Sequence, residues 1–202
     1  MTDFHSLNPS KKLIYIEQLF SHINTFYPLS QPSLDALTGC FEKVILPRNE
    51  RLVTEGSACR HMYFLQQGAL RGYYNLDGRE VTHWFAFEND FVTSFHSFIT
   101  HRPAVENIQL IEGSVLWSIT RDNLNLLLTA HHEIERLVRI IYETYYIRLE
   151  ERYVNAHFKT ASERYYDLLV RAPHMIERVP LGAIASYLGI TQETLSRIRS
   201  KL

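Results

Sequence analysis

Four polar residues near the C-terminus are spaced so that they could read the bases of a DNA duplex. Helical periodicity places Gln192, Glu193, Ser196 and Arg197 on the face of a short helix opposite Leu195. Arginine can bind guanine O6 and N7 together, glutamate accepts from cytosine N4, and glutamine can pair with adenine. Three neighbours are better placed to contact phosphates: Thr191, Arg199 and Lys201. The alternative is a short helical hairpin with an ordinary solvated face.

A second helix must hold these residues in place, and residues 180–202 have the spacing of a helix-turn-helix. Ala185 stands where a larger side chain would collide with the second helix. Gly189 falls in the turn, where the backbone needs a positive φ. Leu195 supplies an apolar contact between the two helices, and the hydroxyl of Thr191 can cap the second one.

The charge distribution favours a nucleic-acid partner for the C-terminal segment. The chain has 202 residues and a formal net charge of −1, but residues 159–202 hold seven Lys and Arg against four Asp and Glu. No apolar run approaches a membrane span, and the N-terminus does not resemble a signal peptide, so we expect a cytoplasmic protein without membrane contact. Cys40 and Cys59 are nineteen residues apart, which favours two free buried thiols.

The middle of the chain predicts an antiparallel jelly roll or barrel, because short β-rich runs alternate with turn residues. The eight runs are residues 41–46, 51–55, 61–66, 69–75, 80–88, 90–95, 105–112 and 114–120. An amphipathic helix over residues 11–29 and a shorter helix ending near Phe41 precede them. A helix capped by Thr120 or Asp122 follows them.

A much longer helical pattern covers residues 131–158. Its near-heptad spacing predicts a parallel dimer seam formed by Ile134, Leu137, Ile141, Thr144 and Arg148. A helix that only covers the barrel is the alternative. A capping-box pattern over residues 160–163 then begins another helix, which Pro173 ends, and Pro180 is expected at the first position of the next one.

Barrel, long helix and helix-turn-helix, in this order, resemble the catabolite-activator and fumarate-nitrate (Crp/Fnr) family of bacterial transcription regulators over essentially the whole chain. The most specific parts are IASYLGITQETLSRIR near the C-terminus and the glycine-punctuated barrel ending in VLWSITRDNL. The resemblance implies an α+β fold with three parts. These are a cyclic-nucleotide-binding-like jelly-roll barrel with N-terminal helices in residues 1–130, a dimerisation helix in 131–158, and a helix-turn-helix DNA-binding domain in 159–202.

The resemblance also implies partners. Glu193, Ser196 and Arg197 match the E-x-x-S-R pattern of the fumarate-nitrate branch, which implies a palindromic DNA site with TTGA-like half-sites read by a homodimer. Gln192 stands where the cyclic-AMP branch has a base-reading arginine, which argues against that branch's specificity. RNA polymerase is a further implied partner, and no catalytic activity or cofactor is expected.

Members that bind cyclic AMP hold its ribose with a glutamate and its phosphate with an arginine. The matching positions here lack both groups: Thr93, Ser94, Phe95, His96, Ala104 and Val105. We therefore expect no tight binding of cyclic AMP, because a buried cyclic phosphate would lack its counter-charge. An unknown small-molecule effector remains open.

Two further departures from the family concern a metal cluster and the end of the chain. Two cysteines are too few for an iron-sulfur cluster that needs about four thiolates. The chain also ends directly after the second motif helix, without the β-hairpin wing of many relatives. We expect either weaker DNA binding or a naturally short variant.

Two other classes of protein are alternatives to a DNA-binding regulator. A metal-dependent cupin-like enzyme with an appended helical hairpin would use histidines such as His83, His96 and His101. No His-x-His pair with a following Glu occurs there, so neither a metal site nor a catalytic residue is expected. The aromatic residues between Trp84 and Phe98 could line an effector pocket, although such residues are more often core. A regulator that acts through protein contacts alone is a third reading.

Overall fold

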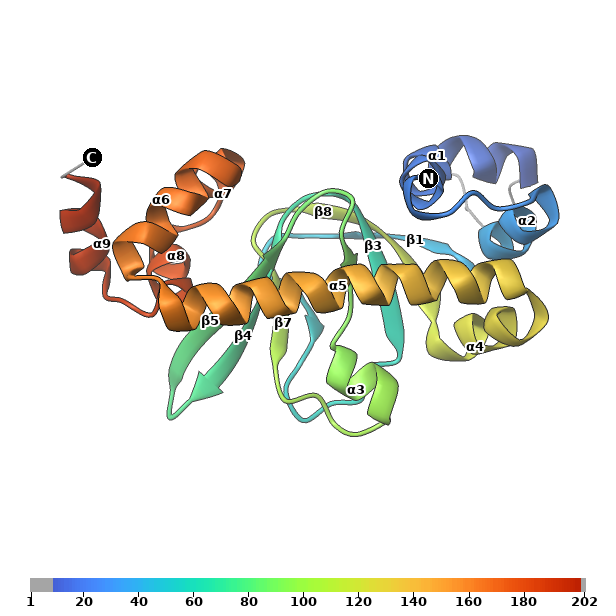
Figure 1. Cartoon of the computed structure of the whole chain (residues 1–202). Coiled ribbons are helices and arrows are strands. Elements are labelled where there is room, and N and C mark those ends of the chain that lie inside the picture. The colour runs from blue at the N-terminus through green and yellow to red at the C-terminus, as the bar shows by residue number, and fades with distance from the viewer. Residues whose placement is uncertain (1–8, 201–202) are drawn as a thin grey trace.

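The computed structural model describes residues 9–200, with side chains from Ile16 onward, so Lys201 lies outside the described residues. The long helix α5 (His132–Phe158) crosses the whole molecule (Figure 1). Two N-terminal helices lie near its beginning, the sheets lie behind its middle, and the C-terminal helices follow its end. The expected order of barrel, long helix and C-terminal helices is therefore present.

The two helices expected before the barrel are α1 (Pro9–Phe26) and α2 (Gln31–Cys40). Ser30 precedes α2 and fixes it to α5, because its backbone N–H and its hydroxyl donate to Glu133 at 3.0 and 2.6 Å. The hydroxyl of Ser33 donates to the same carboxylate at 2.7 Å. These bonds hold the N-terminal helices against the start of the long helix.

The eight expected strand segments form two four-stranded sheets whose paired strands are antiparallel. One sheet has the order β1-β8-β3-β6 and the other β2-β7-β4-β5. The strands are β1 (Glu42–Leu46), β2 (Arg51–Val53), β3 (His61–Gln67), β4 (Leu70–Leu76), β5 (Arg79–Ala86), β6 (Phe91–Val92), β7 (Asn107–Leu110) and β8 (Ser114–Thr120). Consecutive strands mostly lie in different sheets, which closes one core between them.

The prediction of one strand, over residues 90–95, is mostly wrong. Strand β6 keeps only Phe91 and Val92, and the short helix α3 (Phe95–Thr100) begins inside the segment expected to be extended. The Phe98 N–H donates to the Ser94 carbonyl at 2.8 Å, which forms the first helical turn. The run of residues 90–95 was expected to be extended to its end, but Phe95 packs from a helix against Tyr142 and Tyr145 of α5.

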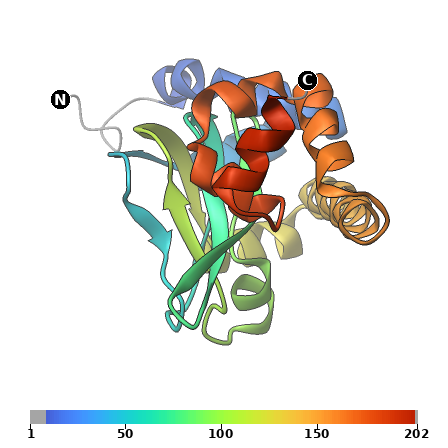
Figure 2. The same cartoon turned by 90° about the vertical axis from the view of Figure 1, so that its left-hand side faces the viewer.

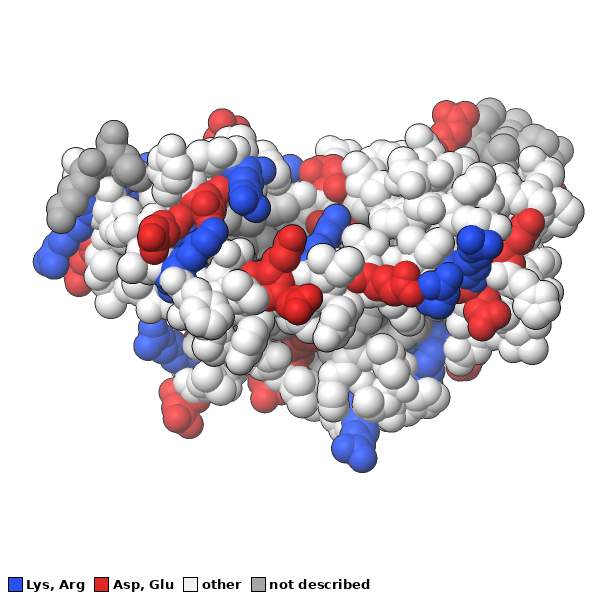
Figure 3. Space-filling view, in the orientation of Figure 1, with Lys and Arg blue, Asp and Glu red and all other residues white. Residues whose placement is uncertain are grey.

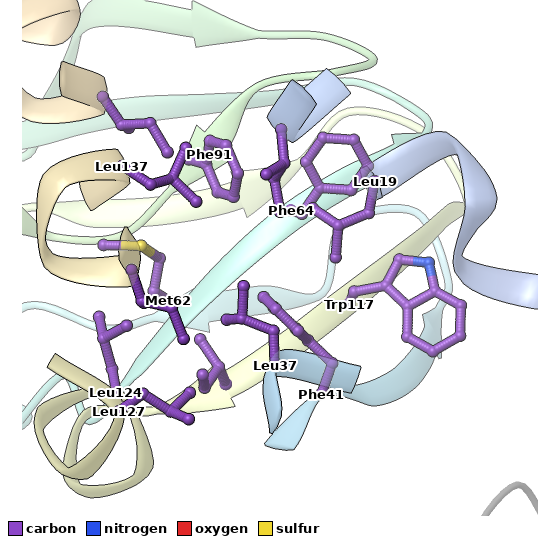
Figure 4. Packing of buried hydrophobic residues seen from close by; sticks show 14 of the residues in the cluster. Leu19, Leu37, Phe41, Met62, Phe64, Phe91, Trp117, Leu124, Leu127 and Leu137 are labelled. Carbon is purple, nitrogen blue, oxygen red and sulfur yellow. The ribbon is translucent and has the colours of Figure 1, made fainter. Parts of the chain in front are cut away.

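The main apolar core lies between the β1-β8-β3-β6 sheet and the helices that cover it (Figure 4). Phe64 and Phe91 pack at 5.4 Å between ring centroids, and Leu19 and Leu137 reach them from α1 and α5. Trp117 is fully buried, and its indole N–H donates to Gln66 at 2.8 Å. Burial of these large side chains fixes where α1, α2 and α5 sit on the sheet.

The predicted dimer seam is wrong for the first half of the long helix. Ile134, Leu137 and Ile141 are at most 5% exposed and belong to the core of their own chain. After the short helix α4 (Arg121–Ala130), whose N-cap is Thr120, the first half of α5 covers the barrel, as the alternative reading held. Only the second half, from Tyr146 onward, is largely exposed.

Four short helices complete the chain: α6 (Ala161–Arg171), α7 (Pro173–Arg178), α8 (Leu181–Tyr187) and α9 (Gln192–Arg199). The expected capping box at the start of α6 is confirmed, since Thr160 accepts from the Glu163 N–H and Glu163 accepts from the Thr160 N–H. Helix α7 was not predicted, because Pro173 begins it as well as following α6. Pro180 is the N-cap of α8, one residue before the expected position.

Candidate nucleic-acid interface and ligand pocket

Helices α8 and α9 are joined by a short turn over residues 188–191 that fixes their crossing. Gly189 has φ +67°, the left-handed conformation expected for it. The N–H of Ile190 donates to the Ala185 carbonyl at 3.0 Å, which closes the turn. Ala185 is 2% exposed and Leu195 is completely buried, so these two residues lie at the interface between the helices.

Three of the predicted base-reading residues lie on the exposed face of α9. Glu193, Ser196 and Arg197 are exposed, and within residues 9–200 their side chains make no hydrogen bond. Figure 2, which views the molecule from the C-terminal end, shows α9 in front of the other helices. Arg199 is also exposed on this helix.

Two predicted contact residues are engaged within the protein. The Thr191 hydroxyl accepts the Thr194 N–H at 3.2 Å, which confirms its role as the N-cap of α9. The Gln192 side chain folds back over α8, so that a Cβ on Gly182 would collide with its amide. In this conformation the Gln192 amide lies against Gly182 of α8.

The C-terminal helices are attached to the barrel through strand β5. The Ser186 hydroxyl on α8 accepts the Thr82 N–H and donates to the Glu80 carbonyl, both at 2.9 Å. Apolar contacts surround these bonds, including a ring contact of 5.3 Å between Phe85 and Tyr187. Helix α8 thus rests on the edge strand of the second sheet.

A half-buried ion-pair cluster forms a second attachment. Both terminal nitrogens of Arg178, at the end of α7, donate to Glu88 at 2.8 Å, and one of them also donates to Glu112 and to the Gly68 carbonyl. Hydrogen bonds from Arg178 lower the pKa of Glu88 to about 2. Glu88 and Glu112 raise the pKa of Arg178, so the pair stays charged at neutral pH.

A cavity of about 730 Å³ lies between the barrel and α5. Strands β4, β5 and β6, helix α3 and the part of α5 from Tyr142 to Asn155 contribute to its walls. Four residues of the predicted effector cassette line it: Thr93, Phe95, His96 and Val105. The other two, Ser94 and Ala104, are buried, and the Ser94 hydroxyl has no hydrogen-bond partner among the described residues.

Glu106 is the most buried charged residue in the cavity wall, at 7% exposed. One of its oxygens, Oε2, lies 2.8 Å from His83 Nε2 and accepts the Trp84 indole N–H at 3.0 Å. The His83 ring stacks on Tyr74 with centroids 4.4 Å apart. Gly72 makes room for Trp84, because a Cβ at that position would collide with the indole.

On the opposite wall, Tyr145 and Arg148 of α5 meet the end of β5 and the start of β6. The Tyr145 hydroxyl accepts the Phe91 N–H, and Arg148 donates to Asp90 at 2.7 Å. Burial raises the pKa of Tyr145, so its hydroxyl remains protonated. These contacts tie the pocket wall formed by the barrel directly to the long helix.

The histidines weighed as metal ligands are not gathered. His83 contacts a carboxylate and two aromatic rings, while His96 and His101 are exposed. Across residues 9–200, no group of three His, Cys, Asp or Glu side chains is arranged to hold a metal ion. Cys40 and Cys59 are both free thiols, although only Cys59 is fully buried.

The strand-rich part of the chain matches a known domain family, and most of the chain is similar to several solved structures. Residues 43–131 match the family model of the cyclic nucleotide-binding domain. FixK2 from Bradyrhizobium japonicum has a TM-score of 0.68 and 21% identity, over 80% of this chain and 84% of that one. The chain has the Crp/Fnr fold. A regulator assigned to the Crp/Fnr family from Eubacterium rectale has a TM-score of 0.70 at 15% identity, over 88% of this chain and 87% of that one.

A further solved structure with the Crp/Fnr fold is the c-di-GMP-responsive global regulator CLP of Xanthomonas campestris. Its TM-score is 0.65 at 16% identity, over 85% of this chain and 91% of that one. A comparison with curated proteins found no match. The expected β-rich domain of the cyclic nucleotide-binding type, followed by C-terminal helices, is confirmed, and the neighbours do not favour a cupin-like enzyme. In residues 9–200 no helix is long and apolar enough to cross a bilayer.

Several residues of the two sites were missed by sequence reasoning. No role was predicted for Glu106, and nothing in the sequence indicated its contact with His83. Arg178 donates to Glu88, which lies ninety residues earlier in the sequence. A pattern of neighbouring residues therefore could not predict this ion pair. Ser186 occupies a helix position that looks solvent-facing until β5 is placed beside it.

Proposed function

We propose that this Crp/Fnr-type chain is a sequence-specific DNA-binding transcription regulator without catalytic activity. The observation that carries the proposal is the division of α9 into two faces. Leu195 packs the inner face into the core, whereas Glu193, Ser196 and Arg197 are exposed, and their side chains have no hydrogen-bond partner among residues 9–200. A short helix held in this way can enter a major groove with unpaired donors and acceptors facing base edges.

The charge distribution limits where DNA can bind. On the face shown in Figure 3, Lys and Arg are interspersed with Asp and Glu and form no continuous basic surface. Arg197 and Arg199 lie in the last turn of α9, at the C-terminal end of the molecule. Binding therefore depends on the two C-terminal helices, with the arginines and the N-terminus of α9 supplying phosphate contacts as well as base contacts.

A homodimer would present two such helices to a palindrome, and a corrected seam supports it. Ile147, Val154 and Phe158 are 54%, 45% and 80% exposed. They follow one another at seven and four residues along α5, so they share one face of the helix. This apolar stripe, with Ile140 before it, is the surface on which a second copy of α5 would pack.

The finer architecture also belongs to this proposal. The interleaved strand orders are those of a double Greek-key jelly roll, which supports assigning a sensory barrel with N-terminal helices to the described part of residues 1–130. We assign dimerisation to α5 and the helix-turn-helix domain to α6 to α9. The cytoplasm and contact with RNA polymerase follow from this function as expectations.

Strand β5 offers a route from the pocket to the DNA-reading helices. Trp84 faces the cavity, its neighbour Phe85 contacts Tyr187, and Thr82 bonds to Ser186. A ligand that shifts β5 would therefore shift α8 and α9 relative to the barrel. Helix α5 borders the same cavity through Tyr145 and Arg148, which gives a second route to the dimer seam.

Selection of bound fragments from random duplex DNA tests this function. Wild type should enrich a palindrome at low salt, with affinity that falls steeply as salt rises. Arg197→Ala should cost about 1–3 kcal/mol and relax one G·C position in each half-site. Arg171→Ala, an exposed arginine on α6, is the matched control and should leave the selected sequence unchanged. If wild type enriches no common DNA sequence, the proposal is contradicted.

A further inference from the structure

We propose that the pocket between the barrel and α5 binds a small organic cation with an aromatic or apolar body, and not an anion such as a cyclic nucleotide. The inference rests on the proposed regulator function and names the class of its effector. It depends on three features of the cavity: one buried carboxylate with a free oxygen, a neighbouring arginine that is already paired, and walls built largely from aromatic rings.

The buried carboxylate is Glu106. Its Oε2 atom is used by His83 and Trp84, but no described residue donates a hydrogen bond to Oε1. A carboxylate oxygen in a largely apolar wall is poorly solvated, and it is stabilised by an N–H donor, most strongly by a charged one. An ammonium group of a ligand supplies that donor, whereas a phosphate or carboxylate would be repelled.

The cations of the cavity wall do not offset this preference. Arg148 donates to Asp90 at 2.7 Å, and its guanidinium lies 5.1 Å from the centre of the Tyr145 ring. The other arginine of the wall is Arg152, one helical turn later. The described lining residues hold three carboxylates, Asp90, Glu106 and Glu151, against these two arginines, so the wall carries an excess of negative charge.

The aromatic walls favour the same class of ligand. Trp84, Phe95 and Tyr142 come from three different elements and line the cavity together with Tyr74 and Tyr145. Ring faces attract cations, most strongly where water is displaced, and they also pack against an aromatic body. The volume of about 730 Å³ suits a molecule of a few tens of atoms at most.

Two indoles of opposite charge test the proposal on the full wild-type chain without DNA. Tryptamine carries an ammonium group and indole-3-propionate a carboxylate on side chains of similar length. Isothermal calorimetry at neutral pH should show tryptamine binding roughly tenfold or more tightly than indole-3-propionate and than cyclic AMP. Equal affinities, tighter binding of either anion, or no binding of tryptamine at millimolar concentration would overturn the proposal.

A variant without the charge of Glu106 tests whether this carboxylate causes the preference for tryptamine. Glu106→Gln keeps the size of the side chain and an acceptor for Trp84, and it should remove most of the difference between the two indoles. Glu151→Gln, an exposed carboxylate of the same cavity, is the matched control and should preserve the difference. A preference that survives Glu106→Gln would assign the charge selection elsewhere and overturn the role of Glu106.

The outcome is separable from the DNA-binding function. If tryptamine is preferred but random duplex DNA yields no palindrome, the ligand class stands and the regulator function fails. If a palindrome is selected but tryptamine is not preferred, the regulator function stands and this ligand class fails.

Discussion

Arg178 and Glu88 form a two-point ion pair in which both terminal guanidinium nitrogens meet both carboxylate oxygens at 2.8 Å. Arg178 ends α7, and Glu88 follows strand β5, so the pair connects the C-terminal helices to the barrel. Glu88 Oε1 also accepts the Gly68 N–H at 2.8 Å, which helps to orient the carboxylate. The position of α8 and α9 relative to the pocket therefore depends on this contact.

Removal of the arginine should loosen the C-terminal helices. We expect Arg178→Ala to weaken their attachment to the barrel by about 1–3 kcal/mol, because two carboxylates lose their partner. The Thr82 amide, which donates to Ser186 across the same junction, reports the change through faster hydrogen exchange. Arg171→Ala should leave that exchange rate unchanged. Equal protection of Thr82 in wild type and Arg178→Ala would show that the apolar contacts alone hold α8.

The attachment should also weaken in acid. Arg178 lowers the pKa of Glu88 from 4.5 to about 2 in the folded protein. A depressed pKa contributes stability that is complete above pH 4.5 and lost as the pH falls toward about 2. Exchange at the Thr82 amide, corrected for its intrinsic pH dependence, should therefore rise across this window. In Glu88→Gln that rise should disappear, and an unchanged rise would assign the titration to another group.

Local patterns in the sequence were enough to predict most elements. Gly189 has the positive φ that its place in the turn required, and Thr160 and Thr191 cap the helices they were expected to cap. Each of these features is decided within a few residues, so a short stretch of sequence contains the whole physical argument. The jelly-roll-like alternation of strands and turns was predictable for the same reason.

Features decided by distant partners were not predictable. Ile134, Leu137 and Ile141 have coiled-coil spacing, but the spacing alone does not say whether they pack on a partner helix or on the chain's own β3 and α1. The helical state of Phe95–Thr100 depends on rings of α5 that lie forty to fifty residues later. The carboxylate of Glu106 contacts His83 and Trp84, which lie more than twenty residues earlier on β5. These contacts depend on the tertiary fold, so the sequence around Glu106 does not predict them.

The corrected dimer seam is testable by charge insertion. The double substitution Ile147→Asp and Val154→Asp should convert a dimer to a monomer in sedimentation experiments, because it places carboxylates in an apolar interface. The free energy of unfolding of the monomer should change by no more than about 0.5 kcal/mol, since both residues are exposed in the single chain. Tyr153→Asp, at a residue that is 61% exposed but about a third of a helical turn away, is the control and should stay dimeric. Persistence of the dimer in the double variant would place the interface elsewhere.

Gly72 lies directly against the indole of Trp84, which lines the pocket. Gly72→Ala should push the Trp84 indole away, because the new Cβ would occupy the space of the ring. The indole would then lose its bond to Glu106, and the free energy of unfolding should fall by about 1–3 kcal/mol from overpacking. Trp84 emission should shift to longer wavelength, while the fully buried Trp117 gives a constant contribution. Gly39→Ala on α2, where an added Cβ meets nothing within 4 Å, is the control and should not lower stability. Unchanged emission in Gly72→Ala would mean that the strand, and not the indole, moves to accept the methyl group, and Glu106 would then keep its indole partner.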